Sequence, residues 1–523
     1  MIDMTILMII LVTFILRILP GALGWINTYA GDINFHLLCA ERIRESGFKC
    51  PKKLKGFILP GIYDYPPLFH YILALIPRAH RERFSFLISP VIDTIHVMII
   101  YYSVSYLLSL NRQLYIGNDP EIIAAIAALF FATSPALLYD GIGPRSYIAT
   151  PRTLGELFIT ITFISQLFYL LNNNLGFLFL ACFFSALTLL TSKFGGQVLI
   201  FFSVGLMVFL WRYEFILLPI IGILFATIIS KGKYIEILNG WVKHSLLFKE
   251  VLIHKMPIFS ARNNLKQFRN LANAVAYGDF KGFEKSALDL ITNNTYIILV
   301  IRNVMLFPLI VLVADKLYII TSNSLIIFLI GWISISLLVF FITSLKPFLF
   351  LGEAERYIEY SIPAQIILFT ILNMSPRAVF ILLIYNIIFY LFNIFMIHFA
   401  YRGRKELKEA TEKLINWFTI QNIKGKRILS IYVDNYFIAY RTDNLVLWPP
   451  GNFTKIDKEL VNYLWEELEW PNRNLSLLIN KYNIDLIIVN NKYLNYANRN
   501  GWDYNLSKYN VTYIDSFFTV YQL

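Results

Sequence analysis

Long apolar segments constrain the fold of this chain more than any other feature. Eleven of them are candidate membrane spans, at residues 4–20, 86–110, 121–138, 153–171, 175–192, 195–211, 215–230, 296–314, 323–342, 358–374 and 378–400. A helix needs about 20 apolar residues to cross the hydrocarbon core of a bilayer. Only 15% of the residues are charged, against about 25% in soluble proteins. The sequence therefore predicts an α-helical polytopic membrane protein with about eleven transmembrane helices.

The number of spans also predicts which loops lie outside the cell membrane. With a cytoplasmic N-terminus, the outer side receives loops 21–85, 139–152, 231–295 and 343–357 and everything after residue 400. The short inner loops carry Arg112, Arg212, Lys316 and Arg377, as the positive-inside rule expects. Loop 231–295 is basic and opposes this orientation, although loops longer than about 60 residues follow the rule poorly.

The segment 66–77, "PPLFHYILALIP", is apolar but too short to span and is bracketed by prolines. Proline is tolerated in the first turn of a helix but not in its interior. We therefore expect residues 66–83 to form one helix that lies at the membrane interface.

Beyond residue 400 the pattern changes to short β-branched runs between helical segments. The runs "RILSIYV", "LVLW" and "IDLIIVN" begin at residues 427, 445 and 484. The sequence pattern predicts helices at 403–418 and 458–468. Alternating helices and buried strands predict a small α/β domain. The predicted organisation is a transmembrane domain over 1–400 and an outer α/β domain over 401–523.

The net charge of +12 comes from basic residues scattered through the loops that flank apolar segments. At such places lysine and arginine contact lipid headgroups or anionic ligands. The expected partners are therefore the lipid bilayer and an anionic ligand, with no nucleic acid.

Candidate functional residues gather in four segments of the predicted outer loops, each of which brings an acid. They are Asp32 and His36; Asp64; Asp140, Arg145 and Arg152; and Glu353 and Arg356. Acids can act as a base on an acceptor, and the planar guanidinium groups suit bidentate binding of phosphate. Arginines that only reach toward lipid headgroups remain the alternative for each of these positions.

Asp32 and His36 stand four residues apart, so on a helix they share one face. A carboxylate there can accept a proton from a hydroxyl nucleophile, and an imidazole can orient a substrate or bind a metal. Asp32 is equally suited to cap the helix that follows it, and both interpretations stay open. For His36 a hydrogen-bonded role is favoured over metal binding, and Asp93, within a span, is expected to pair with a neighbouring helix.

The first outer loop opens with "GDINFHLLCAERIRESG" and closes with "YDYPPLFHYILALIP", and a late span opens with "ERYIEYSIP". These motifs resemble the glycosyltransferase-C superfamily, which includes protein O-mannosyltransferases, aminoarabinose transferases and oligosaccharyltransferases. The resemblance implies that Asp32 is a general base, that Pro66 and Pro67 shape the entry to a juxtamembrane helix, and that Arg356 approaches a lipid-linked phosphate. Two departures stand out, since Ile33 replaces the second acid of the family's motif and Asp140 has no Asp-x-Asp partner.

The resemblance implies an inverting transfer of a sugar from a polyprenyl-phosphate-linked donor to a protein, lipid or glycan acceptor on the outer face. Transfer of a lipid-linked oligosaccharide is an alternative. A divalent metal is the cofactor that stays open, and a requirement for it would favour this alternative. A transporter or flippase of lipid-linked sugars is the alternative from another class. It would predict broken helices within the membrane, whereas the sequence places only Asp93 and Arg302 well inside spans and neither at a glycine–proline break.

Overall fold

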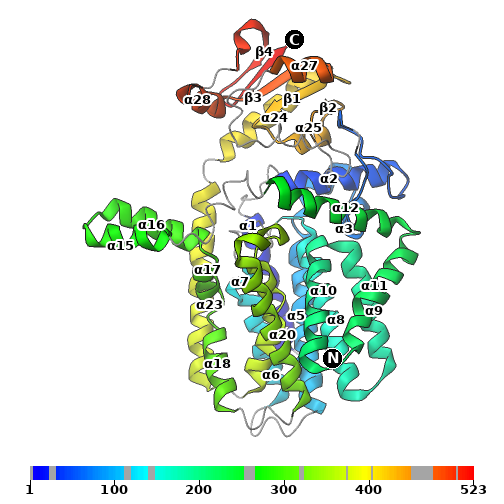
Figure 1. Cartoon of the computed structure of the whole chain (residues 1–523), viewed down its shortest axis with the longest axis vertical. Coiled ribbons are helices and arrows are strands. Elements are labelled where there is room, and N and C mark those ends of the chain that lie inside the picture. The colour runs from blue at the N-terminus through cyan, green and yellow to red at the C-terminus, as the bar shows by residue number, and fades with distance from the viewer. Residues whose placement is uncertain are drawn as a thin grey trace. The chain divides into compact units, whose positions relative to one another are not determined.

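The computed structural model describes residues 4–22, 31–59, 61–110, 119–138, 148–252, 266–316, 323–372, 375–401, 404–448, 475–501 and 504–523. The chain divides into two compact units (Figure 1). The first comprises Met1–Ile26, Phe86–Tyr234 and Ile258–Ile397, and the second comprises Asn27–Ser85, Ile235–Pro257 and His398–Leu523.

The first unit is a bundle of mostly apolar helices. Its elements are α1 (Met4–Pro20), α5 (Ile88–Leu110), α6 (Pro120–Thr133), α7 (Pro135–Leu138), α8 (Pro151–Asn172), α9 (Leu175–Thr191), α10 (Lys193–Leu210), α11 (Glu214–Ile229), α15 (Lys266–Ala276), α16 (Phe280–Asn293), α17 (Thr295–Arg302), α18 (Leu306–Asp315), α20 (Ser324–Ser344), η4 (Lys346–Leu351), α21 (Glu355–Glu359), α22 (Ile362–Ile371) and α23 (Pro376–Tyr401).

Within the described residues, six helices are long and apolar enough to cross a membrane: α5, α6 with α7, α8, α10, α20 and α23. The shorter apolar helices α1, α9, α11 and α22 and the bent pair α17–α18 account for the other five predicted segments. The polytopic helical architecture is thus confirmed. That all eleven segments cross the membrane stays a prediction.

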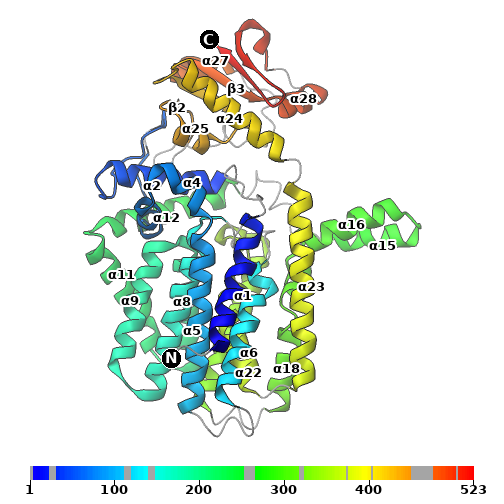
Figure 2. The same cartoon turned by 180° about the vertical axis from the view of Figure 1, so that it is seen from behind.

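Polar side chains join neighbouring helices of the bundle. Arg17 on α1 lies 2.8 Å from Asp93 on α5, and both side chains are fully buried. The predicted pairing of Asp93 with a neighbouring helix is therefore confirmed. His96 on α5 lies 2.8 Å from the Thr160 hydroxyl on α8. Figure 2 shows α1, α5 and α6 side by side in the bundle.

The candidate span 296–314 is bent, because α17 and α18 meet at an angle of 72°. The break lies at Asn303–Met305, where Asn303 leaves the helical conformation with φ −122° and ψ 47°. Pro308 stands in the first turn of α18 and lacks the N–H that a continuous helix would bond to the Val304 carbonyl, so it is a local signal for the break.

The starts of α5, α8 and α10 lie together at one end of the bundle. The Ser89 hydroxyl at the start of α5 donates to the Ile148 carbonyl, just before α8, at 2.9 Å. A Cβ at Gly155 on α8 would lie 2.9 Å from the Cβ of Ser192, the N-cap residue of α10, and 3.8 Å from the Tyr360 hydroxyl. This packing brings the segment after α21 to the same end.

The second unit combines helices of the first loop with the C-terminal α/β fold. Its elements are α2 (Gly31–Glu45), α3 (Leu68–Leu75), α4 (Arg78–Ser85), α12 (Lys233–Leu247, whose first two residues belong to the bundle), η3 (Phe248–Leu252), α24 (Arg404–Ile420), β1 (Arg427–Ile431), α25 (Asn435–Arg441), β2 (Leu445–Val446), α27 (Leu475–Tyr482), β3 (Leu486–Asn490), α28 (Asn491–Arg499), η5 (Leu506–Lys508), β4 (Asn510–Ile514) and β5 (Phe518–Gln522).

The sheet has the strand order β2-β1-β3-β5-β4. The three strands that the sequence predicts, β1, β2 and β3, pair in parallel, with Ile428 opposite Leu486. The β4–β5 hairpin, which the sequence pattern did not predict, adds two antiparallel strands. The predicted helix at 458–468 lies outside the described residues.

The first loop is built into this α/β unit. The backbone N–H of Ile58 donates to the Val446 carbonyl at 2.9 Å, and the N–H of Val446 donates to the Gly56 carbonyl at 3.0 Å. Leu59 packs in the same apolar core as Leu429 and Ile487 of the sheet. The unit that carries the C-terminal sheet therefore also contains the predicted catalytic loop.

The predicted single helix 66–83 is wrong, because the structure has two helices, α3 and α4, with a break at Ile76 and Pro77. Ile76 adopts an extended conformation with φ −76° and ψ 125°. The ring of a proline disfavours the helical conformation of the residue before it. Pro67 is the N-cap residue of α3.

Candidate functional site

The structure places His36 on α2 in a buried chain of hydrogen bonds with α3. Its Nδ1 lies 2.8 Å from Nε2 of His70, and the Tyr63 hydroxyl lies within hydrogen-bond distance of Nδ1 of His70. All three side chains are buried. His36 thus has the hydrogen-bonded role that was favoured from the sequence, and its contact with substrate stays a prediction.

Burial shifts the titration of this network. Loss of solvent lowers the pKa of His70 well below its ordinary value, and the neighbouring His36 lowers it further. Burial likewise raises the pKa of the Tyr63 hydroxyl. The imidazole of His70 is therefore neutral at physiological pH, which suits a chain of hydrogen bonds that holds α2 against α3.

Asp32 and Asp64 belong to the same unit as this network. α2 begins at Gly31, so the backbone of Asp32 lies in its first turn, while its side chain lies outside the described residues. Asp64 is 2% exposed, and a Cβ at Gly240 of α12 would lie 2.9 Å from its carboxylate. Glycine at position 240 therefore allows α12 to approach the buried carboxylate.

The C-terminal domain contacts α2 directly. The Asn34 amide donates to Asp434 Oδ2 at 2.7 Å, while Asp434 Oδ1 accepts from the backbone N–H of Tyr436 and caps α25. At the other end of α25, Arg441 binds Glu82 of α4 and Glu412 of α24. These contacts join α2 and α4 to the C-terminal domain.

Arg152 lies at the centre of an ion cluster in the first unit. Its Nε donates to Glu359 Oε2 at 3.1 Å, and its Nη2 contacts both oxygens of that carboxylate. Glu156, one turn along α8, lies 3.4 Å from the same Nε. The side chains of both glutamates are 3% exposed and that of Arg152 is 10% exposed. One buried guanidinium therefore faces two carboxylates.

Arg356 stands three residues before Glu359 on α21, so the two predicted arginines lie in one region. Its Nε lies 3.2 Å from Glu353, and its guanidinium carbon lies 5.6 Å from the centre of the Phe194 ring. A quarter of its side chain is exposed. Gly352 has φ +103°, and a Cβ there would lie 3.0 Å from the Phe194 ring, so glycine is needed for this turn.

The structure thus brings together some predicted site residues and leaves others untested. Arg152, Glu353 and Arg356 gather at one end of the bundle, whereas His36 and Asp64 lie in the second unit. Asp140 and Arg145 lie outside the described residues. Within the described part of the chain, no group of three or more His, Cys, Asp or Glu side chains is arranged to hold a metal ion.

A small buried cavity lies at the break between α17 and α18. It is lined by Ser134, Pro135, Arg302, Asn303, Val304, Met305, Ile362, Gln365, Ile366 and Asn386. Arg302, Asn303 and Gln365 are all buried. No broken helix was predicted within the membrane, and this counted against a transporter. Because α17 and α18 form such a broken helix, with Arg302 at the break, that argument no longer applies.

Four residues of these networks were not chosen from the sequence: Tyr63, His70, Glu156 and Glu359. Each lies in a stretch that the motifs already included, "YDYPPLFHY", "PRTLGE" or "ERYIEY". For Glu156 and Glu359 the available signal was a charge four positions after Arg152 and three positions after Arg356 on the same helical face. Tyr63 and His70 have no such spacing from a chosen residue.

No protein-family model matches the sequence, and no curated protein matches it. Solved structures do match. The oligosaccharyltransferase of Archaeoglobus fulgidus, tethered with an acceptor peptide, superposes with a TM-score of 0.56 at 11% identity, over 95% of this chain and 70% of that one. ArnT from Cupriavidus metallidurans, bound to undecaprenyl phosphate, superposes with a TM-score of 0.53 at 11% identity, over 99% of this chain and 97% of that one. The chain has the glycosyltransferase-C fold. The structure of the A. fulgidus enzyme complexed with Zn and sulfate is also similar, with a TM-score of 0.50 at 11% identity, over 99% of this chain and 73% of that one.

The glycosyltransferase-C fold agrees with the resemblance drawn from the loop motifs. At 11% identity it describes the arrangement of the backbone. The chemistry has to be argued from the side chains of this chain.

Proposed function

We propose that the chain is a multi-pass glycosyltransferase of the cell membrane that transfers a sugar from a polyprenyl-phosphate-linked donor to an acceptor on the extracytoplasmic face. The observation that carries the proposal is the shared fold with ArnT bound to undecaprenyl phosphate, over 99% of this chain and 97% of that one. The cluster of arginines and glutamates at one end of the bundle supports it, because such a donor presents its phosphate at the membrane surface.

The proposed reaction is a single displacement with inversion at the anomeric carbon. The Asp32 carboxylate accepts the proton of the acceptor hydroxyl as its oxygen forms a bond to that carbon. The bond between the anomeric carbon and the phosphate oxygen breaks, and polyprenyl phosphate leaves with the electron pair. The acceptor is a protein, a lipid or a glycan.

Arg356 is the proposed partner of the departing phosphate. Its partly exposed guanidinium can stabilise the charge that develops on the leaving oxygen. Arg152, held by Glu156 and Glu359, is proposed to fix α21 against α8 and so to orient Arg356. Direct contact of Arg152 with the donor stays a prediction.

The outer orientation rests on the number of spans. The starts of α5, α8 and α10 and the turn before α21 lie at one end of the bundle, in agreement with the predicted outer side of loops 139–152 and 343–357. The C-terminal domain, which follows the last predicted span, is proposed to be extracytoplasmic on the same reasoning.

The test is transfer by the purified full-length protein in liposomes that contain polyprenyl-phosphate sugars. Asp32→Asn should abolish transfer, because the amide cannot accept the proton, while the melting temperature stays at the wild-type value. Asn34→Ala is a control for disturbance of α2 and should retain measurable transfer. Substantial activity of Asp32→Asn would refute the role of Asp32 as the base.

Transfer of a whole lipid-linked oligosaccharide is the second candidate. It is favoured by the TM-score of 0.56 with the oligosaccharyltransferase structure that carries a tethered acceptor peptide. Oligosaccharide transfer that is lost with a chelator and restored by a divalent cation would support it over the single-sugar reaction. The break at Arg302 favours the third candidate, a transporter or flippase of lipid-linked sugars, which would move the donor across the bilayer unchanged.

A further inference from the structure

Helices α15 and α16 form a hairpin that the proposed reaction does not use. A short turn at Tyr277–Asp279 joins them, and Gly278 in that turn has φ +64°. Asp279 caps α16 by accepting a hydrogen bond from the backbone N–H of Gly282 at 3.0 Å. The hairpin is therefore a folded element with defined faces.

Each helix of the hairpin carries an apolar stripe that remains exposed. At 100° per residue, Phe268 and Val275 lie on one face of α15, and Phe280, Phe283 and Ile291 lie on one face of α16. Phe280 is 88% exposed and Val275 is 62% exposed. Tyr277 at the tip is 84% exposed. Glu284 also lies on this face of α16. Apolar side chains this exposed, aligned on one face of each helix, are typical of an interaction surface.

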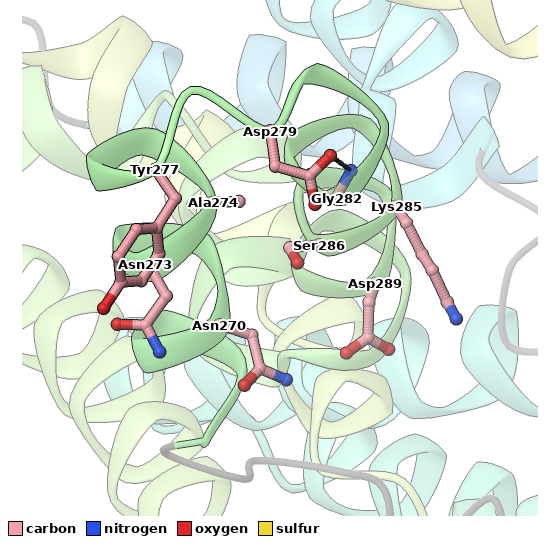
Figure 3. Close-up of a pocket in the computed structure, with 9 residues that line it drawn as sticks. All are labelled: Asn270, Asn273, Ala274, Tyr277, Asp279, Gly282, Lys285, Ser286 and Asp289. Atoms are coloured by element: carbon pink, nitrogen blue, oxygen red, sulfur yellow. Dashed lines mark hydrogen bonds between the residues drawn. The ribbon is translucent and has the colours of Figure 1, made fainter.

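The opposite face of the hairpin is polar. An open hollow between the two helices is lined by Asn270, Asn273, Ala274, Tyr277, Asp279, Gly282, Lys285, Ser286 and Asp289 (Figure 3). By the same 100° rule, Asn273 on α15 and Lys285 on α16 point away from the apolar stripes. The hairpin thus separates an apolar side from a polar side.

The hairpin is attached directly to a membrane helix. Asn294, the only residue between α16 and α17, caps α17, and its side-chain amide donates to Gln267 Oε1 on α15 at 3.3 Å. Leu299 of α17 packs on the apolar cluster of Phe340 and Ile358, near the arginine–glutamate cluster. Figure 1 shows the hairpin projecting sideways from the bundle beside the start of α17.

We propose that the hairpin α15–α16 lies in the bilayer interface, with its apolar stripes in the acyl-chain boundary and its polar hollow toward the headgroups. A two-sided element that leaves a bundle sideways at the start of a membrane helix meets lipid on its apolar side. An amphipathic helix with aromatic residues on one face and lysines on the other is the kind that embeds in this zone. Tyrosine at the tip suits the boundary itself, where its ring is apolar and its hydroxyl is hydrated.

The test is photo-crosslinking of the full-length protein in liposomes of phosphatidylethanolamine and phosphatidylglycerol. Phe280, Phe283 and, as the control on the polar face, Asn273 are each replaced by p-benzoylphenylalanine. On illumination the benzophenone inserts into C–H bonds within its immediate reach, and mass spectrometry identifies the adduct. Because all three positions are exposed or nearly so, the replacements are expected to leave the fold intact.

The proposal predicts phospholipid adducts on the acyl chains for Phe280 and Phe283, at least several-fold more abundant than for Asn273. Equal and low lipid labelling at all three positions would overturn it, since the hairpin would then lie in water. Protein adducts in place of lipid adducts at Phe280 and Phe283 would also overturn it, since a protein would then cover the apolar side.

Discussion

The buried cluster of Arg152, Glu156 and Glu359 makes a prediction about which single substitution costs most. At separations of 3.1 and 3.4 Å, and at an effective dielectric constant of about 20, each glutamate attracts Arg152 by about 5 kcal/mol. Either carboxylate can therefore replace the other as counter-ion. Glu359→Gln is expected to lower the free energy of unfolding by only about 1–2 kcal/mol, because Glu156 still neutralises the guanidinium.

Arg152→Met removes the guanidinium that both carboxylates share. It leaves two buried carboxylates facing each other, and loss of one partner of a buried ion pair costs about 3–5 kcal/mol. The double variant Glu156→Gln/Glu359→Gln leaves the guanidinium uncompensated instead. It is expected to cost more than the sum of the two single variants, by about 1–3 kcal/mol of coupling.

The assay is equilibrium unfolding in mixed micelles, followed by the intrinsic fluorescence of the full-length protein. Glu353→Gln serves as the control, because that carboxylate is a quarter exposed and its loss should cost less than about 1 kcal/mol. A loss for Arg152→Met no larger than that for Glu359→Gln would refute the shared-counter-ion account. Strictly additive effects of the two glutamine substitutions would refute it as well.

Three further predictions follow from single positions. Because the pKa of His70 is lowered in the folded protein, the unfolded chain binds an additional proton below about pH 6.5, so stability should fall with pH below that value. In melting curves measured across pH, His70→Gln should reduce this loss of stability, whereas His80→Gln, at an exposed position, should not. Gly240→Ala places a Cβ 2.9 Å from the buried carboxylate packed against α12 and should destabilise the fold by about 1–3 kcal/mol, while Asn239→Ala, exposed on the same helix, should melt as wild type. Gly352→Ala meets both a positive φ and an aromatic ring at 3.0 Å. If this turn orients Arg356, the proposed partner of the phosphate, the substitution should lower kcat of transfer several-fold, and an unchanged kcat would contradict that role.

The membrane helices could be predicted from the sequence because their signal is local. A run of about 20 apolar residues needs no knowledge of its neighbours to be recognised. The buried strands β1, β2 and β3 carry the same kind of signal in their β-branched runs. β4 does not, because its residues are mostly exposed. β5 has a buried run of β-branched and aromatic residues, FTVYQ, so its signal was present and was missed.

The contacts that define the candidate site are distant in sequence and could not be read from local pattern. Arg152 meets Glu359 across 207 positions, and Asn34 meets Asp434 across 400. Asp32 and Arg356 could be chosen from motifs because those motifs concentrate charge beside apolar spans. Which acid faces which arginine depends on helix packing, which no single segment encodes.

A local signal for the break at Arg302 was present in the sequence and was missed. Helices usually kink at proline, at glycine or where a polar group enters the hydrogen-bond ladder. Here Pro308, in the first turn of α18, lies four residues after Val304 and cannot donate a hydrogen bond to its carbonyl. Polar side chains from the α6–α7 junction, α22 and α23 line the cavity at this break.

The most direct test of the proposed glycosyl transfer is the mass of the lipid and of the acceptor after incubation with the wild-type protein in liposomes. The proposal predicts that polyprenyl phosphate accumulates, that the acceptor gains the mass of one sugar, and that Asp32→Asn yields neither product. An acceptor that gains an oligosaccharide would instead support the second candidate, transfer of a whole lipid-linked oligosaccharide. A donor that crosses the bilayer with its sugar still attached, and without product, would contradict the account.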